Sequence, residues 1–589
     1  MATRTTNVLA AVAAIASIVL AGCRTNDDQR HQSRSAQLHE EPGDPPSAGA
    51  AAGGTLVYYS HFPLVEHLDP QRLYNGRDIS NLARTVYRSW VTFPVSADVE
   101  TATTYVPDLA TDTGTSSQGA RTWTFTLRDG VTWQDGRPIA CADFKYGASR
   151  VFATDVITGG PQYLLTYLDI PLDERTGLPI YTGPYHSSAT GRAAFDRAIT
   201  CNGRTITYHF KKPWADFPLA VASLHMMDPY RADKDRGRRS DFQIFSNGPY
   251  ELEGTWDEEE GGTLVRNPSY DPSTDTTRSR RALPNRIVFD IGKNPEQITD
   301  RLIADRGRDR AAVSGESIPR TYFSRITGEV AERAVAVTSP YTWFLVPNFR
   351  RLTVLKVRQA LAASVDVTAW VEAGGGDKAE KEATDIVHPA MRGYQKGLFP
   401  GGSGNPARAR QLLESAGVQT PYPITFSYIS NGPIADAQAE ALKQGWEKAG
   451  FKVGLDGRTE KEYYGIVGQP SQKADILWTG WGPDWPSAIT VTPPLFDSRP
   501  NLTETSNGDD LGRYRSARFE ALVDEAQNAP DLDAATTVLQ QADQVLADDV
   551  AYIPLGIPVF YLLHGSAVTG YVNTAASNWY PDLGAIGVR

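Results

Sequence analysis

The stretch Thr122-Trp-Thr-Phe-Thr-Leu-Arg-Asp-Gly-Val-Thr-Trp-Gln-Asp-Gly-Arg-Pro138 decides the expected fold. Its first six residues alternate polar and apolar side chains, which is typical of a strand with one buried face. Asp129-Gly130 is a turn dipeptide, and Val131 to Trp133 predicts a second strand after it. A second turn at Asp135-Gly136 then leads toward a helix that begins near Cys141. The stretch therefore predicts a β-hairpin followed by a helix.

The C-terminal half of the chain alternates between helical and strand-like patterns. Helical periodicity covers residues 406–416, 433–449 and 516–528, and strand-like runs cover 423–429, 451–455 and 474–478. Such alternation predicts an α/β lobe with a mixed sheet covered by helices. The length from Gly53 to Arg589 exceeds what one hydrophobic core supports, so we expect two or three lobes.

Residues 1–22 read as a signal peptide. They hold one charge, Arg4, and the apolar run Val8 to Leu20, which is too short to span a bilayer. The sequence Leu20-Ala-Gly-Cys23 resembles the lipobox of bacterial lipoproteins, in which the cysteine becomes the first mature residue and carries acyl chains. More than one chain makes a stable anchor. The alternative is an ordinary secretory signal with an incidental cysteine at position 23.

The segment 23–52 is rich in Ser, Pro, Gly, Ala and charged residues, and it predicts a disordered tether after the lipidated Cys23. Over the whole chain the net charge is −11. This charge disfavours nucleic acid as a partner, because nucleic-acid binding needs clustered Lys and Arg. It suits a folded body that does not adhere to an anionic membrane surface.

The three cysteines divide between two roles. Cys23 is assigned to the lipid, and Cys141 and Cys201 then form either a disulfide in an oxidising extracytoplasmic space or two buried thiols. We predict the disulfide. The chain has nine histidines, no Cys-x-x-Cys and no His-Glu-x-x-His, so the sequence predicts no metal site and no cofactor.

A tryptophan-rich stretch, Lys473 to Ile489, is the candidate functional segment. After an expected strand end at Leu477 it places Trp478, Trp481 and Trp485 among glycines and prolines, with the carboxylate of Asp484 in the middle. An acid among indole rings suits a cation, through charged hydrogen bonds and the negative ring faces. The alternative is a structural loop in which Asp484 is a solvated turn residue.

The hairpin stretch 122–138 resembles the signature of family 5 extracellular solute-binding proteins, which are the oligopeptide- and dipeptide-binding components of ABC importers. Further segments resemble landmarks of this family in chain order from about residue 53 to 583. They are Pro107–Ala110, Ser246–Tyr250 with Leu264–Tyr270, Asn348 with Val357–Leu361 and Val365-Asp366, Asn405–Gly417 and Tyr552–Leu555.

The resemblance implies a periplasmic-binding-protein-like fold with two α/β lobes joined by crossing strands, plus an extra small domain. Residues 53–95, 225–335 and 556–589 would form lobe I, 96–224 the small domain, and 336–555 the second lobe. Ligand would be enclosed when the lobes close about a hinge.

The resemblance also implies a ligand site. In peptide-binding members a Gly-Trp-x-x-Asp run supplies the carboxylate that holds the ligand's α-ammonium. Gly480-Trp-Gly-Pro-Asp484 matches this run, so we assign amine binding to Asp484 and its packing neighbour to Trp481. After the Asp, Trp485-Pro-Ser487 departs from the pattern of many members. Trp485 is therefore the residue expected to shape this protein's own specificity.

Three functions are compatible with a chain of this kind. The first is a monomeric, lipid-anchored protein on the extracytoplasmic face of the cell membrane that binds short peptides for an ABC permease. The second is a binding protein of the same fold for a sugar, a nickel complex or a lipid-linked glycan. The third is an extracytoplasmic peptidase or esterase, which the lack of a catalytic triad or metal motif disfavours. We predict the first, with no catalytic residue.

Overall fold

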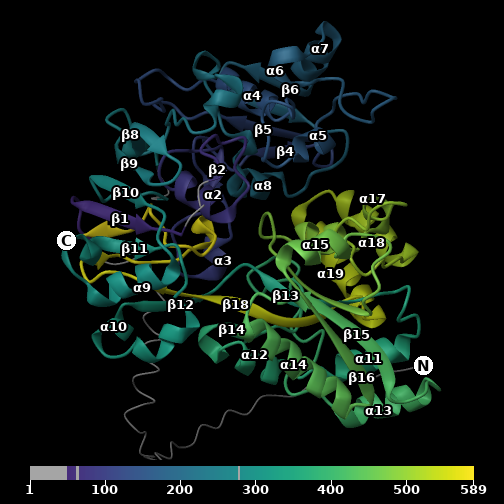
Figure 1. Cartoon of the computed structure of the whole chain (residues 1–589). Helices are drawn as coiled ribbons and strands as arrows, with labels where there is room; N and C mark the ends of the chain where they lie inside the picture. Colours follow the sequence, from purple (N-terminus) through teal and green to yellow (C-terminus); the bar gives the residue numbers. More distant parts are fainter. Residues whose placement is uncertain (1–49, 62–65, 276–278) are drawn as a thin grey trace, which may run out of the picture.

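The computed structural model describes residues 50–61, 66–275 and 279–589. The predicted signal peptide, the lipidated Cys23 and nearly all of the tether lie outside the described residues. The described chain forms two α/β lobes, and the long strand β18 (Ile553–Leu563) runs from one to the other (Figure 1).

The sheet of the first lobe has five strands. In spatial order they are β11 (Ala312–Ser314), β1 (Thr55–Tyr59), β10 (Arg286–Asp290), β9 (Gly261–Arg266) and β8 (Tyr250–Asp257). β1 pairs in parallel with β10 and β11, so it lies inside the sheet. Its side chains alternate between two hydrophobic clusters, Leu56 and Tyr58 in one and Val57 and Tyr59 in the other. Burial on both faces explains why the strand is apolar and aromatic throughout.

A separate antiparallel sheet of four strands lies above the first lobe in Figure 1. Its order is β4 (Thr115–Ser117), β5 (Thr122–Thr126), β7 (Thr205–His209) and β6 (Ile199–Asn202). On β5, Trp123 and Phe125 are buried, whereas Thr124 and Thr126 face the threonines of β7. The alternation of the sequence thus places one face of β5 in the core, as predicted.

The predicted partner of β5 is wrong. Val131 to Trp133 is not a strand, and Thr132 makes a single isolated bridge to Pro138. β5 pairs over its whole length with β7, which begins 79 positions after Thr126. The reason is that β4 pairs with one edge of β5 and β7 with the other, so no edge of β5 is left for residues 131–133.

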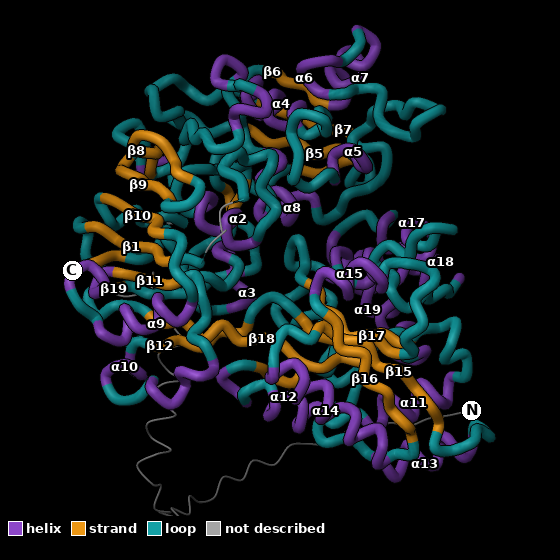
Figure 2. The backbone as a smooth tube through the Cα atoms, in the orientation of Figure 1, coloured by secondary structure: helices purple, strands orange, loops and turns teal. Residues whose placement is uncertain are grey.

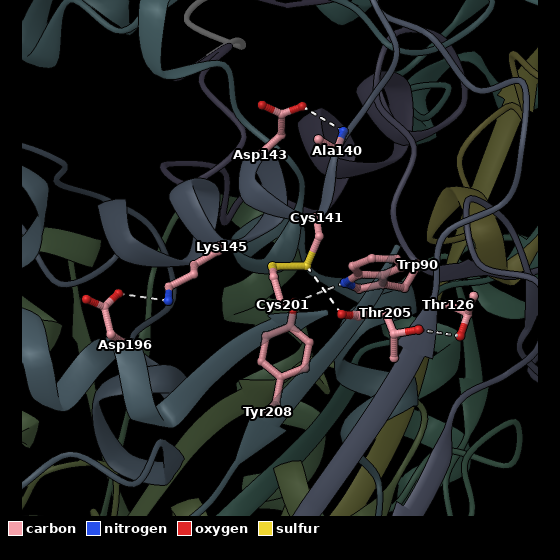
Figure 3. Close-up of a disulfide and its surroundings, with 10 residues drawn as sticks. All are labelled: Trp90, Thr126, Ala140, Cys141, Asp143, Lys145, Asp196, Cys201, Thr205 and Tyr208. Carbon is pink, nitrogen blue, oxygen red and sulfur yellow. Dashed lines mark hydrogen bonds and ion pairs between the residues drawn. A yellow bond between two sulfur atoms is a disulfide. The ribbon is translucent and has the colours of Figure 1, made fainter. Parts of the chain in front are cut away.

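The disulfide between Cys141 and Cys201 is present, which confirms the predicted pairing. Cys141 is the first residue of α4 (Cys141–Arg150), and Cys201 lies in β6 (Figure 3). The bond therefore joins a helix to the edge strand of the four-stranded sheet. The same helix is further tied to α7 (Ala189–Ala198) by an ion pair between Lys145 and Asp196.

The second lobe is built on a seven-stranded mixed sheet. Its main path is β12 (Ala334–Thr338), β18, β13 (Thr342–Pro347), β17 (Ile476–Trp481), β15 (Tyr422–Ile429) and β16 (Phe451–Arg458), and β14 (Glu380–Glu382) pairs with β18. β18 pairs with β12 through one half and with β13 and β14 through the other. β12 and β18 are thus the strands that connect the two lobes.

Helices cover both faces of this sheet, with α12 and α14 on one side and α15, α18 and α19 on the other (Figure 2). The helices of the second lobe are α11 (Leu355–Ser364), α12 (Val367–Ala373), α13 (Pro406–Ser415), α14 (Pro433–Lys448), α15 (Glu460–Val467), α16 (Thr492–Phe496), α17 (Ser498–Asn501), α18 (Ala517–Gln527) and α19 (Leu532–Asp549). The predicted alternation of helices and strands is therefore confirmed. The local causes are visible at α13, where Asn405 caps the first turn and Pro406 occupies the first helical position.

One boundary in this lobe differs from the prediction. The strand expected to end at Leu477 continues to Trp481, because β13 offers backbone partners as far as Thr342. The tryptophan-rich stretch is therefore partly strand, and its loop begins at Gly482.

The remaining elements belong to the first lobe and the four-stranded sheet. They are α2 (Gly76–Ala83), α3 (Val99–Ala102), α5 (Tyr163–Tyr167), α6 (Gly183–His186), α8 (Phe217–Ser223), α9 (Pro295–Ala304), α10 (Glu329–Glu332), β2 (Val91–Thr92), β3 (Val106–Pro107), β19 (Val568–Thr569) and β20 (Gly587–Val588). Within the described ranges, no helix has the length and apolar character needed to cross a membrane.

Candidate ligand-binding site

Asp484 follows the end of β17, where the chain passes between aromatic side chains. A Cβ atom on Gly480 would lie 2.2 Å from the Trp343 ring, and one on Gly482 would lie 2.5 Å from the Tyr341 ring. Real Cβ atoms do not approach so closely, so glycine is required at both positions. The Gly-Trp-Gly-Pro spacing thus lets the strand end lie flat against these rings before Asp484.

Two tyrosines hold the Asp484 carboxylate. The hydroxyl of Tyr163, the first residue of α5, donates to Oδ2. The hydroxyl of Tyr74, in the loop before α2, donates to the same oxygen at 3.0 Å. Both tyrosines lie outside the second lobe, so the carboxylate bridges across the gap between the lobes.

The electrostatic setting of Asp484 favours a cation. Burial raises the pKa of its carboxyl, and the two tyrosine hydrogen bonds oppose that rise. Within the described residues, Asp484 forms no ion pair. A half-buried carboxylate that accepts hydrogen bonds but has no positive neighbour can gain a charge-assisted bond from a ligand ammonium group.

A cavity of about 370 Å³ opens beside Asp484 and draws its walls from both lobes. Its lining consists of Tyr74, Gly76, Ile79, Ser223, Leu224, Pro340, Tyr341, Trp343, Tyr464, Gly480, Trp481, Gly482, Pro483, Asp484 and Asn578. Aromatic and small residues predominate, with few polar groups. This is the composition expected of a site that encloses a small organic ligand.

The strand beside the cavity has a free edge. β15 pairs with β17 only at Ile476 and Leu477, and beyond that point β17 pairs with β13 alone among the described strands. From Trp478 to Trp481 the other edge is therefore without a strand neighbour in the described part of the chain. An extended ligand backbone can hydrogen-bond to such an edge.

The predicted site residues occupy different positions. Gly480, Trp481 and Asp484 line the same cavity, and the Trp481 indole N–H donates to the Thr490 carbonyl at 2.7 Å. Trp485 is only 3% exposed. Its indole N–H donates to the carboxylate of Asp216, which lies just before α8.

Trp485 thus makes contact across the gap between the lobes. Its ring lies 4.8 Å from that of Tyr163, edge to face, and it belongs to the hydrophobic cluster shared by the first lobe and the four-stranded sheet. The space that it lines beside Asp484 is about 20 Å³, which holds about one water molecule. A direct ligand contact by Trp485 stays a prediction.

Tyr74 and Tyr163 were not identified from the sequence. They lie 410 and 321 positions before Asp484, and no local pattern connects residues so far apart. A weak signal exists for Tyr163, which follows the turn-forming Gly159-Gly-Pro161. No group of His, Cys, Asp and Glu in the described ranges is arranged to hold a metal ion.

The two lobes, the cavity between them and the carboxylate on its wall define a solute-binding protein. The chain belongs to the bacterial extracellular solute-binding proteins, family 5: the family profile for the middle part of these proteins matches residues 104–502. The predicted family is therefore confirmed.

Known proteins of this kind match most of the chain. The dipeptide-binding protein DppE of Bacillus subtilis (strain 168) is 22% identical over 460 residues, which cover 74% of this chain and 76% of DppE. The probable deoxycholate-binding periplasmic protein YgiS of Escherichia coli (strain K12) is 24% identical over 452 residues, covering 74% and 77%.

A solved structure supports the fold. That of clavulanic acid biosynthesis oligopeptide binding protein 2 superposes with a TM-score of 0.80 at 25% identity, covering 92% of this chain and 96% of the other. The predicted periplasmic-binding-protein-like fold with two lobes is confirmed.

Proposed function

We propose that this protein binds short peptides between its two lobes and delivers them to an ABC importer. The observation that carries the proposal is the Asp484 carboxylate, which faces the inter-lobe cavity and has hydrogen-bond donors but no described cationic partner. A peptide's α-ammonium supplies that missing charge. The hydrogen bond between the two charged groups contributes about 1.5–3 kcal/mol.

The free edge of β17 supports the peptide class. The Trp478 carbonyl accepts from the Tyr463 hydroxyl, and the backbone groups beyond it on this edge can pair with the ligand main chain, which is common to all peptides. Names of relatives point the same way, since dipeptide- and oligopeptide-binding proteins are among them. The related deoxycholate-binding protein represents the alternative, a non-peptide solute. An anionic ligand of that kind would be repelled by Asp484, which disfavours it here.

Membrane attachment forms part of the proposal. Lipidation of Cys23 would anchor the protein on the extracytoplasmic face of the membrane, and the tether up to residue 52 would let a monomeric body reach the permease. We also propose that residues 53–95, 225–335 and 556–589 form lobe I, 96–224 the small domain and 336–555 the second lobe. The protein would act by binding alone, without catalysis.

Native mass spectrometry of the purified protein tests the ligand class, because a ligand enclosed between closed lobes survives purification. A set of bound masses that fit short peptides supports the proposal. A single mass that fits a sugar, a glycan or a bile acid would replace it with the non-peptide alternative. Hydrolysis of an added peptide would instead point to an enzyme.

A further inference from the structure

A second cavity adjoins the one at Asp484. It measures about 300 Å³ and shares Tyr464, Gly480 and Trp481 with the first. Its other lining residues include Phe344, Val346, Leu495, Phe496, Gly508 and Asp509. Gly480 and Trp481 belong to β17 and Tyr464 to α15, so a ligand chain along the free edge of β17 would adjoin both cavities.

The walls of this second cavity are mostly apolar, and Asp509 is their one charged residue among the described residues. Phe344 and Val346 come from β13, and Leu495 and Phe496 from α16. Asp509 contributes the carboxylate, and no ion pair links it to any described residue. A long side chain with an apolar stem and a charged tip fits such a surface, because the stem covers apolar residues while the tip meets the acid.

The charged residues that line the two cavities are all acidic among the described residues. Among the described residues that line the two cavities, Asp484 and Asp509 are acidic, and none is Lys, Arg or His. Tyr74 lies within electrostatic reach of both acids: burial raises the pKa of its hydroxyl, and both carboxylates raise it further. The site therefore presents two negative charges, of which the α-ammonium of a peptide neutralises one.

The backbone holds Asp509 in place. Its N–H donates to Oδ1 of Asn501 at 2.8 Å, and the Asn501 amide donates to the Pro494 and Asp497 carbonyls. Gly508 has a φ of +56°, and a Cβ atom there would lie 2.3 Å from Oδ1 of Asn501. The turn is therefore tightly packed, and it fixes the backbone of Asp509 at the cavity before ligand arrives. Preorganisation of this kind lowers the entropic cost of binding.

The hydration of Asp509 also fits a binding role. Its side chain is accessible to solvent, yet the cavity removes part of its hydration and raises the pKa of the carboxyl. A positive ligand group would stabilise the Asp509 carboxylate and so replace the hydration that the cavity removes.

We propose that Asp509 binds the ammonium or guanidinium group of a lysine or arginine side chain, and that this protein selects peptides with such a residue near their amino terminus. This inference rests on the proposed peptide-binding function. It adds that the ligand carries two positive charges, one for Asp484 and one for Asp509.

The test uses calorimetry with the purified lobes and tether, trialanine, and three trialanine derivatives that carry one lysine at position 1, 2 or 3. Each lysine peptide is paired with its norleucine counterpart, which keeps the apolar stem and lacks the charge. At one position we expect the lysine peptide to bind at least ~10-fold more tightly than the norleucine peptide. We expect Asp509→Asn to bring this ratio close to one.

Glu504→Gln is the matched control, because Glu504 is an exposed acid of the same loop that does not line either cavity. This variant should keep the wild-type ratio. Three results would overturn the proposal: no lysine preference at any position, an undiminished ratio in Asp509→Asn, or an equal loss in Glu504→Gln. Trialanine distinguishes the lysine preference from peptide binding in general. If trialanine fails to bind the wild-type protein, the proposed peptide-binding function itself is contradicted.

Discussion

The hydroxyl of Tyr74 lies 3.0 Å from Oδ2 of Asp484, across the gap between the lobes. Together with Tyr163 it satisfies the carboxylate when the lobes are close, and neither hydroxyl neutralises its charge. Asp484 is thus hydrogen-bonded by two tyrosines and has no cationic partner among the described residues. A ligand ammonium group therefore adds to an existing polar cluster and does not have to break an ion pair.

Tyr163→Phe should change how peptide binding depends on pH. The Tyr163 hydrogen bond lowers the pKa of Asp484 against the rise caused by burial, so its loss raises that pKa further. The carboxylate binds an ammonium group only when it is deprotonated. As the pH is lowered, the variant should therefore lose peptide affinity at a higher pH than the wild-type protein does. Calorimetry between about pH 4 and pH 8 measures this difference. Coincident pH profiles would argue against this role of Tyr163.

Trp485→Phe should weaken closure of the lobes. The variant loses the indole N–H that donates to Asp216, a buried carboxyl whose pKa is raised to about 6 by burial. An unsatisfied buried acceptor costs about 1–3 kcal/mol, and this cost falls on the closed state. Small-angle X-ray scattering should show a larger radius of gyration without ligand.

Trp478→Phe is the control for that experiment, because the buried Trp478 indole nitrogen has no hydrogen-bond partner among the described residues. Its ring packs on Trp343 and Trp370 within the second lobe. This variant should leave the radius unchanged. Equal expansion in both variants would mean that loss of ring volume, and not the contact with Asp216, opens the molecule.

Stability should fall as pH rises, because of a buried pair of carboxyls. The Tyr552 hydroxyl donates to Oδ1 of Asp543 at 2.8 Å and to Oδ1 of Asp385 at 3.2 Å. Burial and the neighbouring Asp385 hold the pKa of Asp543 well above its usual range. A carboxyl with a raised folded-state pKa stabilises the fold below its unfolded value of about 3.9, and this contribution is lost as pH rises through the folded value.

Asp543→Asn should therefore lose less stability than the wild-type protein between about pH 5 and pH 9, measured by urea unfolding. Asp548→Asn removes an exposed carboxylate from the same helix and should retain the wild-type slope. An Asp543 variant with that same slope would show that the pair does not control the pH dependence.

Replacing both Cys141 and Cys201 by serine should destabilise the protein and spare binding. The bond closes a loop of 60 positions, and its loss costs about 4 kcal/mol in the chain-entropy model. No residue of the four-stranded sheet lines the cavity at Asp484, so peptide affinity should stay the same. Denaturant unfolding and calorimetry measure the two effects. An unchanged unfolding midpoint would contradict the structural role.

The sequence predicts best where local periodicity decides the outcome. Segments such as Pro433–Lys448 and Phe451–Arg458 bury one face each, and their pattern of apolar residues carries that information. The strand partner of Thr122–Thr126 could not be predicted in the same way, because a nearby run of three residues and a distant run of five fit equally well on local grounds. Tertiary packing chooses between them.

In the candidate site, too, residues of one local motif could be predicted and residues from distant segments could not. Asp484 was identified because glycines, prolines and tryptophans surround it in the sequence. Tyr74, Tyr163 and Asp509 were missed because each approaches the site from a separate segment. That Trp485 shapes the ligand pocket stays a prediction, and its indole N–H donates to Asp216, a partner 269 positions away that no local pattern reveals. The side chains of the candidate site come from distant segments, and the way in which the two lobes pack determines which of them are in contact.

Calorimetry of the Asp484→Asn variant measures how much Asp484 contributes to binding of a peptide's α-ammonium. Asparagine keeps the shape of the side chain and removes its charge, so thermal stability should change little. We predict that a peptide bound by the wild-type protein loses affinity at least ~30-fold in the variant. Acetylation of the peptide's amino terminus should cause a similar loss in the wild-type protein. Equal affinity of wild-type protein and variant for the same free-amine peptide would contradict the claim.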